Sequence, residues 1–429
     1  MLIHIVSEGE TISSIAQRYG VSAEILAFNN DIAPNARLPL GQPLIIVIPT
    51  LTHTVSEGES LEDIARLYGV SIYELWQRNL ILNGRSEIYP SQVLTIRTER
   101  SPIGEFMTGG YAYPFIEPEL LTRSLPLMGS IMPFTYGFRT DGSLIPLNDD
   151  VLLRSAAFYG TFPVMHLSTL TEGNNFSTEL AVALFASETM QQSLISNILA
   201  NMRDKGYRAL DIDFEFLGAE NAAAYADFVL RSREALNREG YGVMTALAPK
   251  TRADQPGLLY AGHDYRALGE AANALLLMTY EWGYTFGPPL AVSPLPQVEE
   301  VIRYALTEIE SQKLFLGISN YGYDFILPYV KGQSRAQSLS TAQAFSIASQ
   351  TGAEIQYDER AQAPFFEYTA PDGRVHEVWF EDARSISARL ELIPKYSLRG
   401  ALYWNLDRRN TQNLALIEQI VNLKEFSIL

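Results

Sequence analysis

Residues 208–215 read Arg-Ala-Leu-Asp-Ile-Asp-Phe-Glu, a pattern that predicts one β-strand. Its apolar positions form a skeleton, and three carboxylates recur at every second residue: Asp211, Asp213 and Glu215. Because side chains alternate along a strand, all three acids point to the same side. Like charges held this close raise the pKa of at least one of them, which is a common property of functional sites.

The sequence on both sides of this strand favours helices. One helical stretch ends at residues 204–206, and a second covers about 219–239. The acids therefore stand at the carboxyl end of a strand between two helices, which is the end that faces the substrate in a parallel α/β barrel. Two other interpretations are a solvated face of an edge strand and a metal site.

From residue 103 to residue 429 a strand is followed by a helix repeatedly, which predicts an α/β domain. The eight expected strands cover residues 106–113, 130–136, 162–167, 209–214, 242–248, 274–280, 314–319 and 400–404. The helical stretches between them include 178–203, 219–238, 295–311 and 414–422. Eight such units over this length fit a (β/α)8 TIM barrel.

The interval 323–399 is too long for one helix. It contains a helix near residues 340–351 and a hairpin of residues 365–368 and 375–380, turning at 371–373 (Pro-Asp-Gly). We therefore expect an α+β insertion after the seventh strand that forms one wall of a groove.

Polar and aromatic residues follow several of the expected strands: Tyr111 or Tyr113, Tyr136, His166, residues 278–282 (Met-Thr-Tyr-Glu-Trp), Asn320, Tyr321 and residues 403–405 (Tyr-Trp-Asn). Carboxylates ringed by aromatic side chains suit a sugar, because rings stack on pyranose faces and acids break the glycosidic bond. Packing in the core remains the alternative for Tyr111, Tyr113 and Tyr136.

The first hundred residues contain an internal repeat. Residues 4–12 (HIVSEGETI) correspond to residues 53–61 (HTVSEGESL), and the correspondence continues through Tyr-Gly-Val-Ser at 19–22 and 68–71. Each unit reads as strand, helix, helix, strand. We expect Thr11 and Ser60 to cap the first helix, and Gly20 and Gly69 to end it in the left-handed conformation: two devices common at helix ends.

This repeat resembles the LysM module, a small βααβ domain, in units 1–49 and 50–98. The resemblance implies binding of glycans that contain N-acetylglucosamine, such as peptidoglycan or chitin. By analogy one edge of each groove is formed by the loop after the first strand, where the candidates are Gly9, Glu10 and Thr11 in the first unit and Gly58, Glu59 and Ser60 in the second. The links at 49–51 and 98–102 are short, so we expect limited freedom between the modules.

Composition excludes several classes of function. The net charge of −17 argues against nucleic acid or an anionic membrane surface as a partner. The absence of cysteine excludes disulfides and thiol catalysis but leaves the compartment open. No apolar run approaches the length of a membrane span, and residues 1–10 lack the pattern of a Sec signal peptide.

The acidic strand also resembles the D-x-x-D-x-D-x-E signature of family 18 glycoside hydrolases, and residues 278–281 resemble their M-x-Y-[DE] strand. In that family the 2-acetamido group of the substrate is the nucleophile, an exception to the two-carboxylate scheme. The resemblance implies that Glu215 is the general acid and then the base. It also implies that Asp213 orients the acetamido N–H, and that Asp211 shares a proton with Asp213 as a coupled pair.

The remaining site residues follow from the same resemblance. Tyr280 would donate a hydrogen bond to the acetamido oxygen, and Trp404 would form the floor of the sugar subsite. Further sugar-binding candidates are Glu281, Asn320, Tyr321, Tyr136 and Tyr113. No metal or other cofactor is expected, since no His/Cys/Asp spacing suggests one. The signature departs from the family at its first two positions, where Arg208 and Ala209 stand in place of Asp and Gly.

Two LysM-like units ahead of such a barrel, together with residues 379–385 (WFEDARS), are similar to the cortex-lytic glucosaminidases of bacterial spores. This similarity implies a monomeric enzyme of the spore coat and cortex region, or alternatively of the cell wall. The enzyme would cleave β-1,4 bonds after N-acetylglucosamine in cortex fragments, with retention. The competing hypotheses are a chitinase or another peptidoglycan glucosaminidase, and a glycan-binding protein whose barrel has lost activity.

Overall fold

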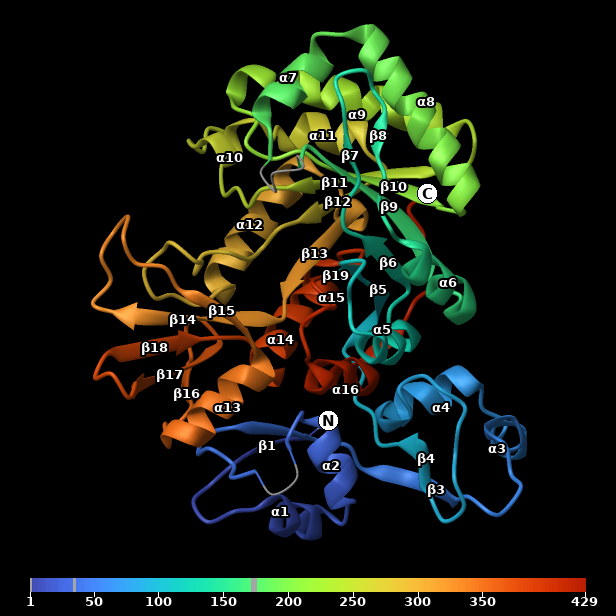
Figure 1. Cartoon of the computed structure of the whole chain (residues 1–429), viewed down its shortest axis with the longest axis vertical. Helices are drawn as coiled ribbons and strands as arrows, with labels where there is room; N and C mark the ends of the chain where they lie inside the picture. The colour runs from blue at the N-terminus through green and yellow to red at the C-terminus, as the bar shows by residue number, and fades with distance from the viewer. Residues whose placement is uncertain (1, 34–35, 171–175) are drawn as a thin grey trace.

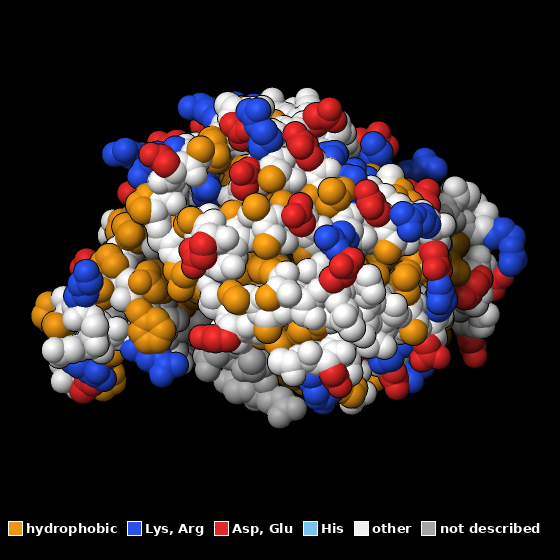
Figure 2. All heavy atoms as spheres, turned by 90° about the horizontal axis from the view of Figure 1, so that it is seen from above, with side chains coloured by type: hydrophobic (Ala, Val, Ile, Leu, Met, Phe, Trp, Pro, Cys, Tyr) orange, Lys and Arg blue, Asp and Glu red, His pale blue; other side chains and the backbone are white. Residues whose placement is uncertain are grey.

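The computed structural model describes residues 2–33, 36–170 and 176–429. Two small modules lie side by side at one end of the molecule, and a barrel with an attached antiparallel sheet forms the rest (Figure 1). Within the described residues no helix is both long and apolar enough to cross a bilayer. On the face seen in Figure 2, acidic and basic side chains are interspersed, so the excess of acidic residues is not gathered into one field there.

Both N-terminal modules have the predicted βααβ order. The first consists of β1 (Leu2–Ile5), α1 (Ile12–Tyr19), α2 (Ala23–Asn29) and β2 (Pro43–Ile46). The second consists of β3 (Pro49–Thr54), α3 (Leu61–Tyr68), α4 (Ile72–Arg78), a short 3-10 helix η1 (Leu80–Leu82) and β4 (Val93–Thr98). In each module the two strands pair antiparallel.

The expected helix ends are present in both modules. The side chains of Thr11 and Ser60 each accept a hydrogen bond from a backbone N–H of the first turn. Gly20 and Gly69 end these helices with φ of 66° and 63°, a region that glycine enters without the steric cost of a Cβ.

One buried asparagine fastens the second helix of each module to its second strand. Asn79 Nδ2 donates to the carbonyl oxygens of Leu75 and Thr95, both at 2.8 Å, and its Oδ1 accepts from the Thr95 N–H at 2.7 Å. Asn30 makes the same three bonds in the first module. Each asparagine thus satisfies three backbone groups that would otherwise be buried without partners.

The eight predicted barrel strands are all present, and parallel pairing closes them into a barrel through the contact between the first and the last. They are β5 (Gly104–Ala112), β6 (Ser130–Pro133), β9 (Phe162–Ser168), β10 (Ala209–Asp213), β11 (Gly242–Leu247), β12 (Ala274–Leu277), β13 (Leu314–Ser319) and β19 (Gly400–Trp404). Side chains from alternate strand positions fill the interior, including Met132, Val164, Met244 and Phe315. The barrel is therefore closed by packing below its open end.

Helices surround the barrel, and their bounds refine the sequence prediction. The longer ones are α5 (Pro118–Ser124), α6 (Asp150–Tyr159), α7 (Thr178–Phe185), α8 (Glu188–Lys205), α9 (Ala222–Asn237), α11 (Tyr265–Ala271), α12 (Leu295–Glu308), α14 (Ala383–Leu390) and α16 (Thr411–Ile420). The single helix predicted over 178–203 is two helices, because Ser187 caps a new one. The helix predicted over 414–422 ends at Ile420, and the next residues form β20 (Val421–Leu423), which pairs with β5.

The insertion after the seventh barrel strand is an α+β unit, as predicted. Its strands are β14 (Tyr321–Leu327), β15 (Gln337–Ser340), β16 (Gln356–Asp358), β17 (Ala363–Thr369) and β18 (Val375–Trp379), and its helix is α13 (Thr341–Thr351). They form one antiparallel sheet in the order β15-β14-β18-β17-β16. The predicted hairpin is the β17–β18 pair. This sheet lies beside the carboxyl end of β13 (Figure 1).

Polar contacts fix the first module against the barrel. The Asp31 carboxylate accepts hydrogen bonds from the N–H and the hydroxyl of Thr411, at 2.6 and 2.7 Å, at the start of α16. A negative charge at this helix end is favourable. Gln412 Nε2 donates to Asn30 Oδ1 at 3.0 Å, and Ser349 Oγ of α13 donates to the Arg37 carbonyl oxygen at 2.7 Å.

The second module is held by separate contacts. The Tyr159 hydroxyl donates to the Gly84 carbonyl oxygen at 2.8 Å, and Gln77 Nε2 donates to the Pro126 carbonyl oxygen at 2.7 Å. A Cβ on Gly84 would lie 2.3 Å from the Thr122 carbonyl oxygen, so the backbones approach closely only because this residue is glycine.

We predict that Asn79→Ala destabilises the second module by about 1–3 kcal/mol, because it leaves buried backbone groups of Leu75 and Thr95 unpaired. Urea unfolding of the whole chain, followed by circular dichroism, measures this loss. The exposed Glu62→Ala on α3 is the control and should change stability by no more than about 0.5 kcal/mol. Equal stability of Asn79→Ala and wild type would contradict the prediction.

Candidate active site

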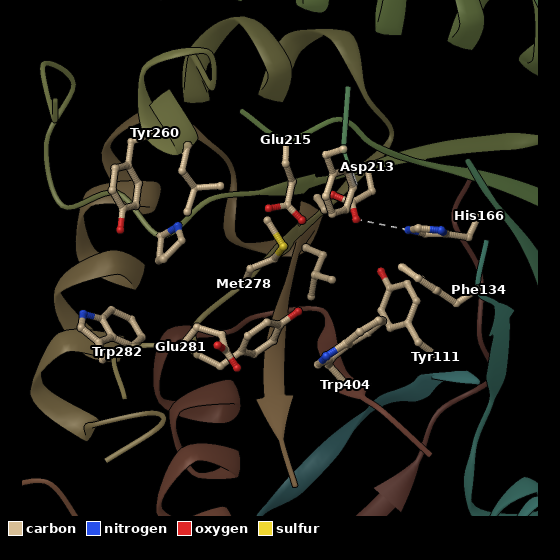
Figure 3. A pocket seen from close by; sticks show the side chains of 16 residues that line it. Tyr111, Phe134, His166, Asp213, Glu215, Tyr260, Met278, Glu281, Trp282 and Trp404 are labelled. Atoms are coloured by element: carbon tan, nitrogen blue, oxygen red, sulfur yellow. Dashed lines mark ion pairs between the residues drawn. The ribbon is translucent and has the colours of Figure 1, made fainter. Parts of the chain in front are cut away.

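A pocket opens at the carboxyl end of the barrel strands, and five of the predicted site residues line it (Figure 3). These are Asp213, Glu215, Tyr280, Glu281 and Trp404. The strand that carries the acids ends at Asp213, so Glu215 stands in the loop just beyond it. Phe216, the next residue, has φ of 58°, a region rarely adopted by non-glycine residues. The backbone therefore turns sharply just after Glu215.

Two aspartates lie at the base of the pocket beside a histidine. Parallel pairing of β9 with β10 places His166 next to Asp211. His166 Nε2 lies 3.4 Å from Asp213 Oδ2 and 3.8 Å from Asp211 Oδ2. The Tyr111 hydroxyl donates to Asp211 Oδ2 at 2.7 Å. One oxygen of each aspartate, Oδ1, is buried without a hydrogen-bond partner among the described residues.

Burial controls the proton affinity of Asp211. This side chain is fully buried, and burial raises the pKa of its carboxyl to about 6, while His166 and the Tyr111 hydrogen bond oppose that rise and Asp213 adds to it. The carboxyl is therefore poised to gain or lose a proton near neutral pH.

Glu215 has the proton affinity of a general acid. Burial, followed by the nearby charges of Asp213 and Glu281, raises the pKa of the Glu215 carboxyl well above its ordinary value. It therefore stays protonated at a pH where a solvated glutamate is ionised. In Figure 3 its carboxyl group projects into the pocket between Asp213 and Tyr260.

Aromatic rings enclose the space in front of these acids. Trp404, at the end of β19, contacts the rings of Phe134 and Tyr111 edge-on, with centroids 4.8 and 5.5 Å away. Tyr280 lines the same pocket as Trp404. Burial, with the charges of Asp213 and Glu215, raises the pKa of Tyr280 well above its ordinary value, so its hydroxyl keeps the proton needed to donate a hydrogen bond.

Glu281 is fixed at the rim of the pocket by the insertion. The hydroxyls of Tyr321 and Tyr323 on β14 both donate to its carboxylate, the latter at 2.9 Å. Its backbone has φ of 68°, a strained conformation for a glutamate. Burial raises its pKa, and the two tyrosine hydrogen bonds oppose that rise. A strained residue held by two donors has a fixed orientation.

The other predicted sugar-binding residues lie outside this pocket. Tyr113 and Tyr321 line a second cleft that shares Trp404 and Glu281 with the pocket. Asn320 is buried, and its Nδ2 donates to the Asn405 carbonyl oxygen at 2.9 Å, so it supports the loop after Trp404 instead of facing the pocket.

Placing Tyr136 at the sugar site is wrong in this structure. The strand predicted to continue to residue 136 ends at Pro133, so Phe134 faces the pocket instead. Tyr136 is 1% exposed within the main core, and its hydroxyl donates to Asp149 Oδ2 at 2.5 Å. It is a packing residue, the alternative that the sequence left open.

Arg208, which replaces the first aspartate of the signature, points away from the acids. It is exposed, and its guanidinium lies 4.3 Å from the centre of the Phe162 ring. The structure therefore places no positive charge from Arg208 beside Asp211. The polar neighbours of Asp211 are instead Tyr111 and His166.

Several pocket residues were not predicted as site residues: Phe134, His166, Pro249, Leu259, Tyr260 and Trp282. His166 was visible at the end of a predicted strand, but its place beside Asp211 depends on the register of β9 with β10. Pro249, Leu259 and Tyr260 come from the segment after β11, where no periodic pattern marks a residue as facing the pocket.

The glutamates proposed for the LysM grooves mainly close their own loops. Glu10 Oε2 accepts from the Ser7 N–H at 2.9 Å and lies 2.7 Å from His4 Nε2. Glu59 makes the same contacts with Ser56 and His53 in the second module. Their carboxylates hold the groove edge in shape.

Comparison with known proteins gives independent evidence. Residues 167–408 match the glycosyl hydrolases family 18, and residues 4–47 and 53–97 match the LysM domain. The chain belongs to glycosyl hydrolase family 18. This family 18 enzyme is a glycosidase with two LysM domains at its N-terminal end.

The similarity extends over the whole glycosidase. It is 39% identical to the cortical fragment-lytic enzyme of Bacillus subtilis over 431 residues, covering 99% of each chain. It is 29% identical over 439 residues to the putative sporulation-specific glycosylase YdhD of the same organism, covering 99% and 100% of the two chains. Its fold is similar to the crystal structure of the spore cortex-lytic enzyme SleL of Bacillus megaterium, with a TM-score of 0.82, 34% identity and 99% of each chain covered.

We predict that Asp211→Asn raises the stability of the barrel, compared with wild type, more at pH 8 than at pH 4.5. The folded-state pKa is raised from 3.8 to about 6, so burying the ionised carboxylate costs stability above pH 6 and costs nothing below pH 4. This difference in pKa between the unfolded and the folded state is equivalent to about 3 kcal/mol of folding free energy. Melting temperatures of variant and wild type at both pH values measure the difference, with the exposed Glu105→Gln as control. A difference independent of pH would contradict the prediction.

Proposed function

We propose that this family 18 glycosidase cleaves the β-1,4 bond after N-acetylglucosamine in spore cortex peptidoglycan, acting on cortex fragments. The full-length similarity to a cortical fragment-lytic enzyme supports the substrate. The arrangement of Asp213, Glu215 and Tyr280 around one pocket floored by Trp404 supports the reaction. The observation that carries the proposal most directly is a glutamic acid kept protonated beside an aspartate that has an unpartnered oxygen.

The first step uses the acetamido group of the sugar in the pocket. Its carbonyl oxygen attacks C1, and the C1–O bond to the leaving sugar breaks while Glu215 transfers its proton to the departing oxygen. The product of this step is a cyclic oxazolinium ion. Tyr280 donates a hydrogen bond to the acetamido oxygen and fixes its direction of attack.

The aspartate pair stabilises the positive charge that develops. Asp213 accepts a hydrogen bond from the acetamido N–H through its free Oδ1. Asp211 behind it exchanges a proton with Asp213 as the charge forms and disappears. In the second step Glu215 takes a proton from water, which attacks C1 and restores the acetamido group with retained configuration.

This mechanism restricts where the glycan is cut. The sugar before the broken bond must carry an N-acetyl group, and the muramic lactam of the cortex has lost this group. Cleavage therefore follows N-acetylglucosamine. The two LysM modules hold the same glycan, and the protein acts as a monomer at the spore. Their fixed position against the barrel supports this joint role, since linked binding sites raise the effective concentration of the substrate.

We predict that Glu215→Gln lowers kcat on cortex fragments by about 10²- to 10⁴-fold, because glutamine has the same shape but no acidic proton. The exposed Glu234→Gln on α9 is the matched control and should retain wild-type kcat. Hydrolysis by Glu215→Gln at the wild-type rate would show that another acid acts, or that the barrel only binds glycans.

Mass spectrometry of the digested fragments tests the substrate assignment in the same experiment. Every new reducing end should be N-acetylglucosamine. New reducing ends on muramic acid would contradict the proposal, and efficient release of chitobiose from chitin without cleavage of cortex would identify a chitinase.

A further inference from the structure

A second cleft adjoins the active pocket and is bounded by the insertion and the loop after β19. Tyr113, Tyr323, Ser338 and Arg408 line it, and it shares Trp404 and Glu281 with the pocket. A sugar chain that occupies the pocket can therefore continue past Trp404 into this cleft.

The cleft lies on the glycone side of the broken bond. The general acid Glu215 must stand next to the leaving sugar, and Glu215 lines the pocket together with Tyr260 and Trp282 but does not line the cleft. Figure 3 places Tyr260 and Glu215 on the far side of the pocket from Trp404. The leaving sugar thus occupies the Tyr260 side, and the cleft receives the sugar that precedes the reacting N-acetylglucosamine.

An aromatic surface at the edge of this cleft suits a pyranose ring. The rings of Tyr113 and Phe115 are stacked, with centroids 5.0 Å apart and planes inclined by 19°. Phe115 is 77% exposed, so its ring is open to a ligand at this edge of the cleft. A sugar lying here would be held next to Arg408.

Arg408 is a half-buried cation whose charge acts on the neighbouring Asp407 carboxyl, where it opposes the rise in pKa that burial causes. Its Nη2 donates to Ser338 Oγ at 3.1 Å, and no carboxylate oxygen of the described residues lies within ion-pair distance of its guanidinium. Its charge acts on the hydroxyls of Tyr113 and Tyr323: burial raises the pKa of both, and Arg408 opposes the rise. The guanidinium is thus held near both rings.

The charge of Arg408 contrasts with its surroundings. Among the described residues lining the pocket and the cleft it is the only lysine or arginine, in a protein of net charge −17. The neighbouring Asp407 is turned to the backbone, where its Oδ2 accepts from the Tyr113 N–H at 3.1 Å. A half-buried guanidinium that makes no ion pair in a binding cleft suits an anionic group on the ligand, because arginine binds carboxylates with two parallel hydrogen bonds.

We propose that Arg408 binds the carboxylate on the 3-O-lactyl arm of a muramic sugar that occupies the cleft directly before the reacting N-acetylglucosamine. This inference rests on the proposed function, in which the substrate alternates these two sugars. Chitin has no such carboxylate, muramic lactam has its carboxylate closed into a ring, and a muramic sugar that carries a peptide has it joined to that peptide through an amide. At this position Arg408 therefore selects a muramic sugar without peptide over chitin, over the lactam and over a muramic sugar that carries peptide.

Two chromogenic substrates isolate this position. Both are 4-nitrophenyl glycosides of a β-1,4-linked disaccharide ending in N-acetylglucosamine, and they differ only in the first sugar: N-acetylmuramic acid in one and N-acetylglucosamine in the other. Release of nitrophenol gives kcat and KM for each. A third substrate, with the lactyl carboxylate converted to its amide, separates charge from size.

We expect wild type to have at least a roughly tenfold higher kcat/KM on the muramic acid substrate than on its amide, since a hydrogen bond to a charged group is lost in the amide. Arg408→Met should remove this preference, mainly through KM, and leave the chitobiose substrate within about twofold of wild type. Arg408→Lys should keep part of the preference. The exposed Arg374→Met at the tip of the β17–β18 hairpin is the control and should behave as wild type.

The outcomes separate this inference from the proposed function. If wild type releases nitrophenol but Arg408→Met changes all three substrates equally, or none of them, Arg408 does not read the carboxylate and the inference is wrong. If wild type releases nitrophenol from none of them, cleavage after N-acetylglucosamine itself is contradicted, and the inference fails with it.

Discussion

The burial of two aspartates at the closed base of one pocket is the constraint on which the rest of the site depends. Asp211 and Asp213 sit on one strand inside a barrel where a charge is costly, and the surrounding structure offsets that cost only in part, through His166 and Tyr111. Burial and the charge of Asp213 therefore raise the proton affinity of Asp211, and they also raise that of Glu215. A cationic intermediate in front of Asp213 would offset the cost of this buried negative charge.

The parts outside the barrel add orientation to this charge arrangement. The insertion supplies the tyrosines that hold Glu281, and together with the loop after β19 it borders the cleft that extends the pocket. The first module is fixed to both α16 and α13, so its groove edge cannot turn freely relative to that insertion. A long glycan would thus meet binding surfaces whose relative positions are set before it arrives.

Sequence patterns predicted the architecture because the strands, the succession of strands and helices, and the N-terminal repeat each follow a regular pattern. The eight strands, the insertion and the repeat with its caps at Thr11 and Gly20 followed from local rules that the packing did not override. The predictions failed for residues whose position depends on how distant segments of the chain pack against one another. Tyr136 turns outward because its strand ends at Pro133, and His166 meets Asp211 only through the pairing of two strands. The break between α7 and α8 was not predicted, although Ser187 is of a residue type that often caps a helix.

In the proposed mechanism the nucleophile is the substrate's own acetamido oxygen, which attacks C1. Progressive fluorination of the acetamido methyl group on 4-nitrophenyl chitobioside, from no fluorine to three, weakens that oxygen as a nucleophile while changing its size little. Measurement of kcat/KM across the series tests the claim directly. If the acetamido oxygen is the nucleophile, kcat/KM falls with each added fluorine. A kcat/KM that stays the same across the series would show that this oxygen does not attack C1.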